Sequence, residues 1–364
     1  MSSLKPLSRS RRLASILGLA TALSTASAAA ALADAPNVVT SIKPLQSLAA
    51  SIMEGVGTPS VLIDGAASPH GYSLKPSQAS QLQNANLVFW IGESLETSLE
   101  KPLSSLAGNA DVVELMQAKG LHLVPFRLGN GFGPHVHEGE GGGHDGHDHD
   151  EAHAHDAGHD GHHDHEGHDH GAADHDDHGQ DHEGGEEGHH HEGTDPHLWL
   201  DPENARIMAA TMADHLAAAD PANAGTYKAN FDKLSARLSE LEAGIRTELE
   251  PVQGKTFVVF HDAYHYFEDR FGLAASGSIT LNPESPPGAD RIREIQQRIK
   301  TDGVVCVFGE PQFEPKLVSV VLEGTDARMA TLDPLGTGLT NGPGLYAELL
   351  QGIAKTMNTC LSGK

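Results

Sequence analysis

Segments with the pattern of a β-strand alternate with segments of helical pattern along most of this 364-residue chain. The alternation runs once through the first third of the chain and again through the last third. Repeated strand–helix units predict parallel sheets flanked by helices. Between the two runs, residues 222–250 contain few helix breakers. Their apolar residues recur at steps of three and four, which predicts one long amphipathic helix; they are Tyr227, Phe231, Leu234, Leu238, Leu241 and Ile245.

The fold class predicted from this pattern is α/β, with two similar lobes of parallel sheet joined by one long linking helix. The expected strands are 37–41, 60–64, 87–91 and 111–115 in the first run, and 256–260, 304–308 and 329–332 in the second. The expected helices are 45–54, 78–86, 95–106, 202–219, 264–271, 291–300, 315–322 and 345–361. The expected domains are a signal peptide at 1–33, an N-terminal lobe at 34–220, the linking helix at 221–250 and a C-terminal lobe at 251–364.

The first 33 residues have the pattern of an export signal. Four basic residues with no acid among them precede an apolar run that begins at Leu13, and a small-x-small site ends at Ala33. No later stretch is long enough to span a bilayer. We therefore expect a soluble protein in the periplasm. Arg11 and Arg12 permit the twin-arginine route beside the general secretory route, so the sequence leaves the export route open.

The formal net charge of −26 argues against nucleic acid and anionic membrane surfaces as partners, and favours cations. Residues 135–191 hold 19 histidines and 18 acidic residues, with no Lys or Arg. This stretch has almost nothing apolar to bury, so we expect residues 128–193 to be an insertion without fixed structure.

At neutral pH most imidazoles of the insertion are uncharged and can bind a metal ion. We expect weak, rapidly exchanging sites that collect metal for a tighter site, although a buffer without transfer and a tract with no role both remain open. The residues of this expected antenna are His144, His147, His149, His153, His155, His159, His162, His163, His165, His168 and His170.

Outside the insertion, four residues stand where a ligand site of an α/β protein is expected. His70 follows the expected strand 60–64, His261 follows 256–260 directly, and Asp333 follows 329–332 directly, while His197 comes soon after the insertion. Ligands of open α/β sheets lie outside the carboxyl ends of the strands. Imidazole nitrogen and carboxylate oxygen suit tetrahedral Zn²⁺, whereas Mn²⁺ prefers sites richer in oxygen. The pattern predicts a zinc site in the cleft between the lobes.

The other histidines outside the insertion, and one glutamate, are not expected to bind the metal. His265 lies four residues after His261 and is expected to be a supporting or surface residue, as are His122 and His215. Glu310 ends an expected strand, and we expect it to form a hydrogen bond at the site rather than bind metal.

The chain resembles the zinc-binding components of bacterial high-affinity zinc ABC importers, in the metal-specific solute-binding protein family. The resemblance covers essentially the whole chain after the signal, with the motifs in the family's order. The matching stretches are SPHGYSLKPS at 68–77, DPHLWLDP at 195–202, VFHDAYHYF at 259–267, FGEPQF at 308–313 and LDPLG at 332–336.

The resemblance implies a periplasmic monomer with two lobes on a rigid helix and Zn²⁺ as cargo. Its partners would be an ABC permease in the inner membrane and the cytoplasmic ATPase of that permease. It implies His70, His197 and His261 as metal ligands, with Asp333 as a fourth ligand or an outer-shell acid. Manganese-binding relatives carry a carboxylate at the position of His261. Some zinc-binding members carry a ligating Glu where this chain has Pro69, so the fourth ligand is either water or Asp333.

Two cysteines, Cys306 and Cys360, occur in the chain. In an exported protein such a pair favours a disulfide over a metal site, with two free thiols as the alternative. The family resemblance implies that the two cysteines form a disulfide.

Three other functions remain open on the sequence. The first is the same transport role for Mn²⁺, and the second is zinc sequestration or sensing without an importer. The third is a zinc hydrolase, because the order His261, Asp262, Ala263, Tyr264, His265 is superficially similar to His-Glu-x-x-His. That segment lacks the Glu that serves as general base, so we expect no enzyme activity. The chain also has no Gly-rich phosphate loop, so we expect it not to hydrolyse ATP.

Overall fold

The computed structural model describes residues 35–127, 193–280 and 283–363. The expected signal peptide and the eleven expected antenna histidines lie outside the described residues. The expected insertion also lies outside them, except for its last residue, Gly193. From Ala35 onward the chain forms one compact unit.

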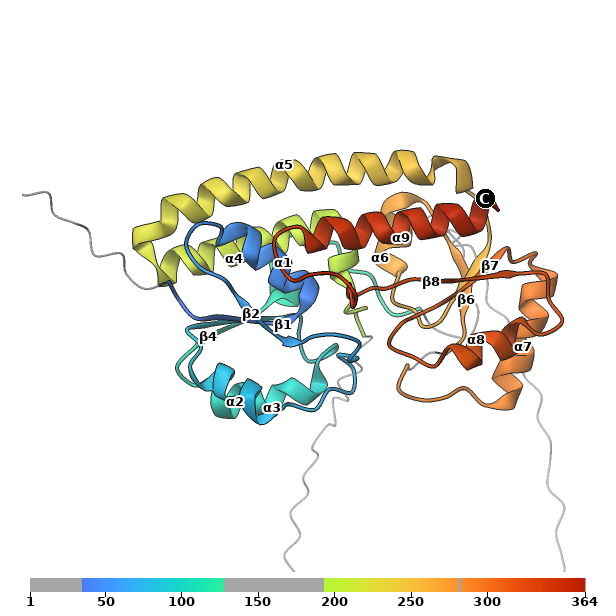
Figure 1. Ribbon diagram of the computed structural model, residues 1–364, viewed down its shortest axis with the longest axis horizontal. Helices are drawn as coiled ribbons and strands as arrows, with labels where there is room; N and C mark the ends of the chain where they lie inside the picture. Colours follow the sequence, from blue (N-terminus) through green and yellow to red (C-terminus); the bar gives the residue numbers. More distant parts are fainter. Residues whose placement is uncertain (1–34, 128–192, 281–282, 364) are drawn as a thin grey trace, which may run out of the picture. The chain divides into compact units, whose positions relative to one another are not determined.

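The first sheet contains four parallel strands in the order β2-β1-β3-β4. The strands are β1 (Val38–Ile42), β2 (Ser60–Ile63), β3 (Leu87–Trp90) and β4 (Asp111–Glu114). Helices α1 (Lys43–Ile52) and α4 (Pro202–Ala219) cover one face, and α2 (Pro76–Gln83) and α3 (Glu100–Leu106) cover the other (Figure 1). Burial on both faces explains why β3 is wholly apolar, while β1 also buries Thr40 and Ser41.

The second sheet repeats this topology, with parallel strands in the order β6-β5-β7-β8. Its strands are β5 (Phe257–Val259), β6 (Ala275–Ser278), β7 (Cys306–Gly309) and β8 (Arg328–Thr331). Its helices are α6 (His265–Phe271), α7 (Ala289–Thr301) and α8 (Pro315–Leu322). The two sheets confirm the predicted α/β class. Within the described ranges, five short 3₁₀ helices complete the elements: Thr97–Leu99, Leu115–Gln117, Leu198–Leu200, Pro221–Asn223 and Glu250–Val252.

Two long helices run past both sheets (Figure 1). Helix α5 (Ala224–Leu249) packs on α1 and α4 of the first lobe and on α6 of the second. Helix α9 (Leu345–Ser362) packs on α5, on α1 and on β8. The buried stripe of α5 includes Leu234, Leu238 and Leu241, as its periodicity predicts. The lobes are therefore bridged twice, by the expected linking helix and by the C-terminal helix.

A disulfide joins Cys306 at the start of β7 to Cys360 near the end of α9. This finding confirms the predicted pairing and fixes the C-terminal helix to the second sheet. Among the described residues, none of the helices has both the length and the apolar character needed to cross a membrane.

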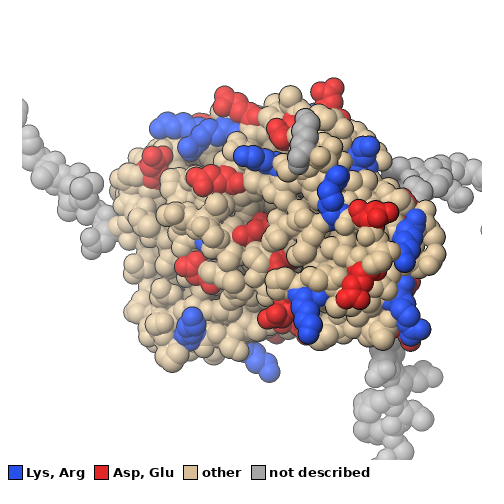
Figure 2. All heavy atoms as spheres, turned by 45° about the vertical axis from the view of Figure 1, so that its right-hand side comes forward, with Lys and Arg blue, Asp and Glu red and all other residues tan. Residues whose placement is uncertain are grey.

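Charged side chains of both signs are interspersed over the face shown in Figure 2. Nineteen of the 50 acidic residues in the chain lie in residues 128–192, and this segment contains no Lys or Arg. Much of the negative charge of the chain is therefore concentrated in one segment of the sequence, which lies outside the described residues.

Candidate metal centre

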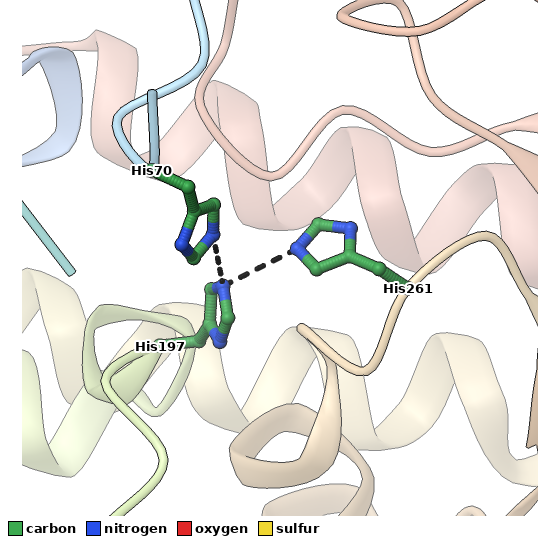
Figure 3. A group of neighbouring side chains, drawn as sticks. All are labelled: His70, His197 and His261. Atoms are coloured by element: carbon green, nitrogen blue, oxygen red, sulfur yellow. Dashed lines mark hydrogen bonds between the residues drawn. The ribbon is translucent and has the colours of Figure 1, made fainter. Parts of the chain in front are cut away.

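Three of the predicted ligands come together from three separate segments. His70 lies in the loop after β2, His197 immediately precedes the 3₁₀ turn Leu198–Leu200, and His261 lies two residues after β5. Their imidazole rings point toward one another (Figure 3). The Nε2 atom of His197 is 3.3 Å from the Nε2 of His70 and 3.3 Å from the Nε2 of His261. One potential ligand atom from each histidine lies within 4.8 Å of the other two.

Buried carboxylates orient two of these rings. The Nδ1 atom of His197 lies 2.7 Å from Oδ1 of Asp195, and the Nδ1 of His261 lies 2.8 Å from Oε1 of Glu310. A proton on each Nδ1 donates to the carboxylate, which leaves the lone pair on Nε2 directed at the other histidines. This carboxylate–histidine arrangement is typical of metal centres, where it fixes the tautomer and makes the imidazole a stronger donor. The role expected for Glu310, hydrogen bonding rather than ligation, matches this contact.

The Asp195 contact was not foreseen from the sequence, although a local signal for it exists. Asp195 stands two residues before His197 and also accepts a 3.0 Å hydrogen bond from the His197 backbone N–H. An Asp that binds the backbone two residues onward is a common turn. The order Asp-Pro-His could therefore have indicated that this carboxylate lies beside the ring.

The pKa values of the three histidines follow from burial and from their neighbours. Burial, together with the nearby His197 and His261, lowers the pKa of His70 to about 2. Burial and His261 lower the pKa of His197 well below its ordinary value. Burial would also lower the pKa of His261, but the charge of Glu310 and its hydrogen bond outweigh that effect and raise it. His70 and His197 are thus neutral at pH 7, which is the form that binds metal.

The cavity enclosed by the histidines measures about 10 Å³ and is also lined by Trp199, Gln312 and Phe313. A cavity of this size holds about one water-sized species, so it suits a single ion rather than an organic substrate. A larger hollow of about 660 Å³ shares Ser68, Gln312 and Phe313 with the cavity and adjoins it.

Asp333, the fourth predicted ligand, lies outside the group of three histidines. Its carboxylate accepts hydrogen bonds from the backbone N–H groups of Leu335, Gly336 and Thr337, at 3.1, 3.0 and 2.5 Å. The Nε2 of Gln312 donates a further bond to it, at 3.2 Å. These bonds order the loop that places Pro334 and Leu335 on the cavity wall. Ligation by Asp333 stays a prediction.

The other histidines of the described segments do not join the group. His265 is the buried first residue of α6. His122 is paired with Asp269 and His215 with Asp111, all four on the surface. These positions agree with the supporting or surface roles expected for them.

The donor set fits Zn²⁺ on its chemistry. Three imidazole nitrogens converge, and the nearest carboxylates lie behind the rings, bonded to Nδ1. Imidazole suits zinc, whereas Mn²⁺ and Mg²⁺ favour sites rich in oxygen.

Two parallel sheets of the same strand order, bridged by two long helices and meeting at an all-imidazole group, define a metal-specific solute-binding protein. A family model described as the periplasmic component A of the zinc-uptake complex, ZnuA, matches residues 38–360. The chain belongs to this family. The family membership confirms the resemblance seen in the motifs and the predicted function in zinc uptake.

Similar proteins cover nearly the same length. The high-affinity zinc uptake system protein ZnuA of Brucella suis is 48% identical, over 89% of this chain and 91% of that protein. The ZnuA of Paracoccus denitrificans is 43% identical, over 95% of this chain and 98% of that protein. A crystal structure of a ZnuA superimposes with a TM-score of 0.66 at 22% identity, covering 90% of this chain and all of that one, which supports the fold.

Proposed function

We propose that this protein binds one Zn²⁺ ion at His70, His197 and His261 in the periplasm and delivers it to an ABC importer. The partners would be a permease in the inner membrane and its cytoplasmic ATPase. The observation that supports the ligand set is the convergence of three Nε2 atoms, two of them on rings oriented by buried carboxylates. The periplasmic location rests on the family's description.

The fourth ligand of the ion would be water or Asp333. The carboxylate would have to release its bonds to Leu335, Gly336 and Thr337 before it could reach the metal. Water needs no such rearrangement.

A zinc hydrolase is a weaker candidate, because a catalytic zinc needs a base beside its water. Among the described residues that line the cavity, the one carboxylate is Glu310, and its Oε1 is already bonded to the Nδ1 of His261. We therefore propose no enzyme activity. Turnover of a peptide or ester that depends on zinc would contradict this.

We also propose that the histidines of residues 128–192 collect zinc at low affinity and pass it to the cleft. Carboxylates interleaved with neutral imidazoles create a negative field that concentrates cations. Gly193, which follows this segment, is four residues before His197, and Arg127, which precedes it, bonds Asp262 next to His261.

Zinc affinity of a chain that lacks residues 136–191 tests the ligand set, because the deletion removes the competing histidines. We expect His70→Ala, His197→Ala and His261→Ala each to weaken zinc binding by about 100-fold or more, since the loss of a mere supporting residue already costs 10- to 100-fold. His215→Ala is the matched control and should bind zinc normally. Unchanged affinity in all three variants would disprove the proposal.

Two further measurements separate the alternatives. Calorimetric competition between Zn²⁺ and Mn²⁺ on the same shortened chain distinguishes the two cargoes, and we expect zinc to displace manganese. A deletion strain that grows normally under chelation would favour sequestration over uptake.

A further inference from the structure

Two short segments flank residues 128–192 and pair with each other; we call 124–127 and 193–195 the stem. Pro125 forms an antiparallel bridge with Thr194. The backbone N–H of Phe126 donates to the carbonyl of Gly193 at 2.8 Å, and that of Asp195 donates to the carbonyl of Val124 at 2.9 Å. The two ends of the histidine-rich segment therefore leave the fold side by side.

The stem lies between β4 and α4 of the first lobe in sequence but packs on helix α6 of the second lobe. The hydroxyl of Tyr266 on α6 donates to the carbonyl of Asp195 at 2.8 Å and accepts from the backbone N–H of Val124 at 3.3 Å. One tyrosine thus holds both strands of the stem against the second lobe.

Arg127, the last described residue before the histidine-rich segment, forms buried ion pairs with two carboxylates of the second lobe. Its Nε donates to both carboxylate oxygens of Asp262, at 3.1 and 3.0 Å. Its Nη1 and Nη2 donate to the two oxygens of Glu268, at 2.8 and 3.0 Å. The side chains of Arg127, Asp262 and Glu268 are only 7%, 12% and 2% exposed. A buried guanidinium that bonds two carboxylates in this way depends on its planar fork, which Lys lacks.

This cluster lies directly behind the metal centre. Asp262 follows His261 in the chain, and Asp195 of the stem holds the ring of His197. Two of the three histidines are thus connected to the stem, one through Asp195 and the other through Asp262 and Arg127.

We propose that Arg127 is a positioning residue: it latches the stem to the second lobe, so that a closed stem and an ordered histidine group stabilise each other. The inference rests on the proposed zinc site. If the stem opens, Asp262 and Glu268 lose their shared cation in a buried place, which is costly. Asp195 and His261 then lose their fixed surroundings. By linkage, an ion that orders the histidines must favour the closed stem to the same extent.

The test is hydrogen–deuterium exchange of the Phe126 and Asp195 amides in the full chain, with and without one equivalent of zinc. Zinc dissociation is followed separately, as transfer to a chelator. In the unaltered protein, zinc should slow exchange of both amides by about 5-fold or more, the lower end of ordinary coupling. In Arg127→Lys this zinc-dependent protection should be lost, exchange should be faster even without metal, and zinc should leave about 5-fold faster or more.

The matched control is Arg270→Lys. Arg270 also joins helix α6 to a buried carboxylate of the first lobe, through two bonds of 2.8 and 2.7 Å to Asp201. This variant should lose thermal stability, as Arg127→Lys does, while it keeps zinc-dependent protection of the stem. If Arg127→Lys does not fold, Asp262→Asn undergoes the same measurements, because Glu268 still holds Arg127 in that variant.

Two negative outcomes have different meanings. If the unaltered protein binds zinc tightly but Arg127→Lys matches it in exchange and release, the latch is disproved while the zinc site stands. If the unaltered protein does not bind zinc at the histidines, the proposed function itself fails.

Discussion

Glu310 shows how a single buried carboxylate orients one histidine of the proposed site. It fixes the Nδ1 proton of His261 and raises the pKa of that ring against the effect of burial. We expect Glu310→Gln to weaken zinc binding by about 10- to 100-fold, because the amide accepts the same bond without the charge. Competition with a chelator measures this. The control is Glu314→Gln, an exposed acid four residues away that should leave the affinity unchanged; equal affinity in both variants would contradict the role of Glu310.

Glu96 makes the stability of the first lobe depend on pH. It is fully buried beside Ser41 and accepts a 3.0 Å bond from the backbone N–H of Gly92. Burial raises its pKa from 4.5 to about 7, so the folded state binds a proton more tightly than the unfolded state. The resulting stabilisation is complete below pH 4.5 and is lost as the pH rises through 7.

We therefore expect Glu96 to contribute up to about 3 kcal/mol of unfolding free energy that is lost as the pH rises from 5 to 8. Urea unfolding at several pH values measures this. Asp195, whose pKa burial also raises to about 7, acts in the same direction as Glu96, whereas His70 and His197, whose pKa values burial lowers, act in the opposite direction. The readout is therefore the difference between variants. The loss of stability due to Glu96 should be absent from Glu96→Gln, so its curve should diverge from that of the unaltered protein as the pH rises, while the exposed Glu93→Gln should follow the unaltered protein. Parallel curves for all three proteins would refute the assignment.

Sequence reasoning selected three histidines that come together in the fold, but not the groups that support them. His70, His197 and His261 were selected because each follows a strand or a motif whose position in the fold is known. The bonds of Asp333 were not foreseen, although the bond from the backbone N–H of Leu335 repeats the local pattern of Asp195, in which an Asp accepts from the residue two positions onward. The pairing of Arg127 with Asp262 could not be predicted, because the two residues are 135 positions apart in the chain.

Hydrophobic periodicity predicted the helices well, but the sequence did not predict a short strand of small polar residues. The predicted bounds of α4 and α8 agree with the structure at both ends. Pro202 and Pro315 mark where these two helices begin. Strand β6 was missed: its residues are Ala, Ser, Gly and Ser, which have low strand propensity, and only its place beside β5 makes it a strand. The helix expected at 95–106 forms a regular α-helix only from Glu100, after a 3₁₀ turn.

The disulfide between β7 and α9 is expected to stabilise the fold without shaping the site. It closes a loop of 54 residues, and its removal in the double variant Cys306→Ala, Cys360→Ala should cost about 4 kcal/mol of unfolding free energy on the chain-entropy model. Zinc affinity at 25 °C should stay the same, because neither cysteine lines the cavity. Urea unfolding with and without reductant measures the effect. Reductant should lower the unfolding free energy of the unaltered protein and leave that of the variant unchanged. An equal decrease in both proteins would contradict the expectation.

For the whole molecule, the main question is whether the histidine-rich segment serves the cleft. We expect deletion of residues 136–191 to leave the affinity of the three-histidine site unchanged and to slow zinc capture at scarce metal. The physical reason is that many weak sites in a negative field raise the local zinc concentration. Stopped-flow capture and growth under chelation measure this. A control segment of equal length, with every His replaced by Ser, separates histidine chemistry from chain length. Unchanged capture and uptake in both would rule out the antenna.

The paired ends of the stem have a consequence for the evolution and the engineering of the protein. Pro125 and Thr194 are bridged, so the two strands of the stem are paired as they would be in a tight hairpin. This pairing does not depend on the sequence inserted between them. Each doubling of such a loop costs only about 0.6 kcal/mol in closure entropy. Tracts of very different length and composition can therefore be exchanged there at little thermodynamic cost. A fluorescent domain inserted between the two strands of the stem would lie beside the candidate metal centre. Its fluorescence would then report whether zinc is bound there.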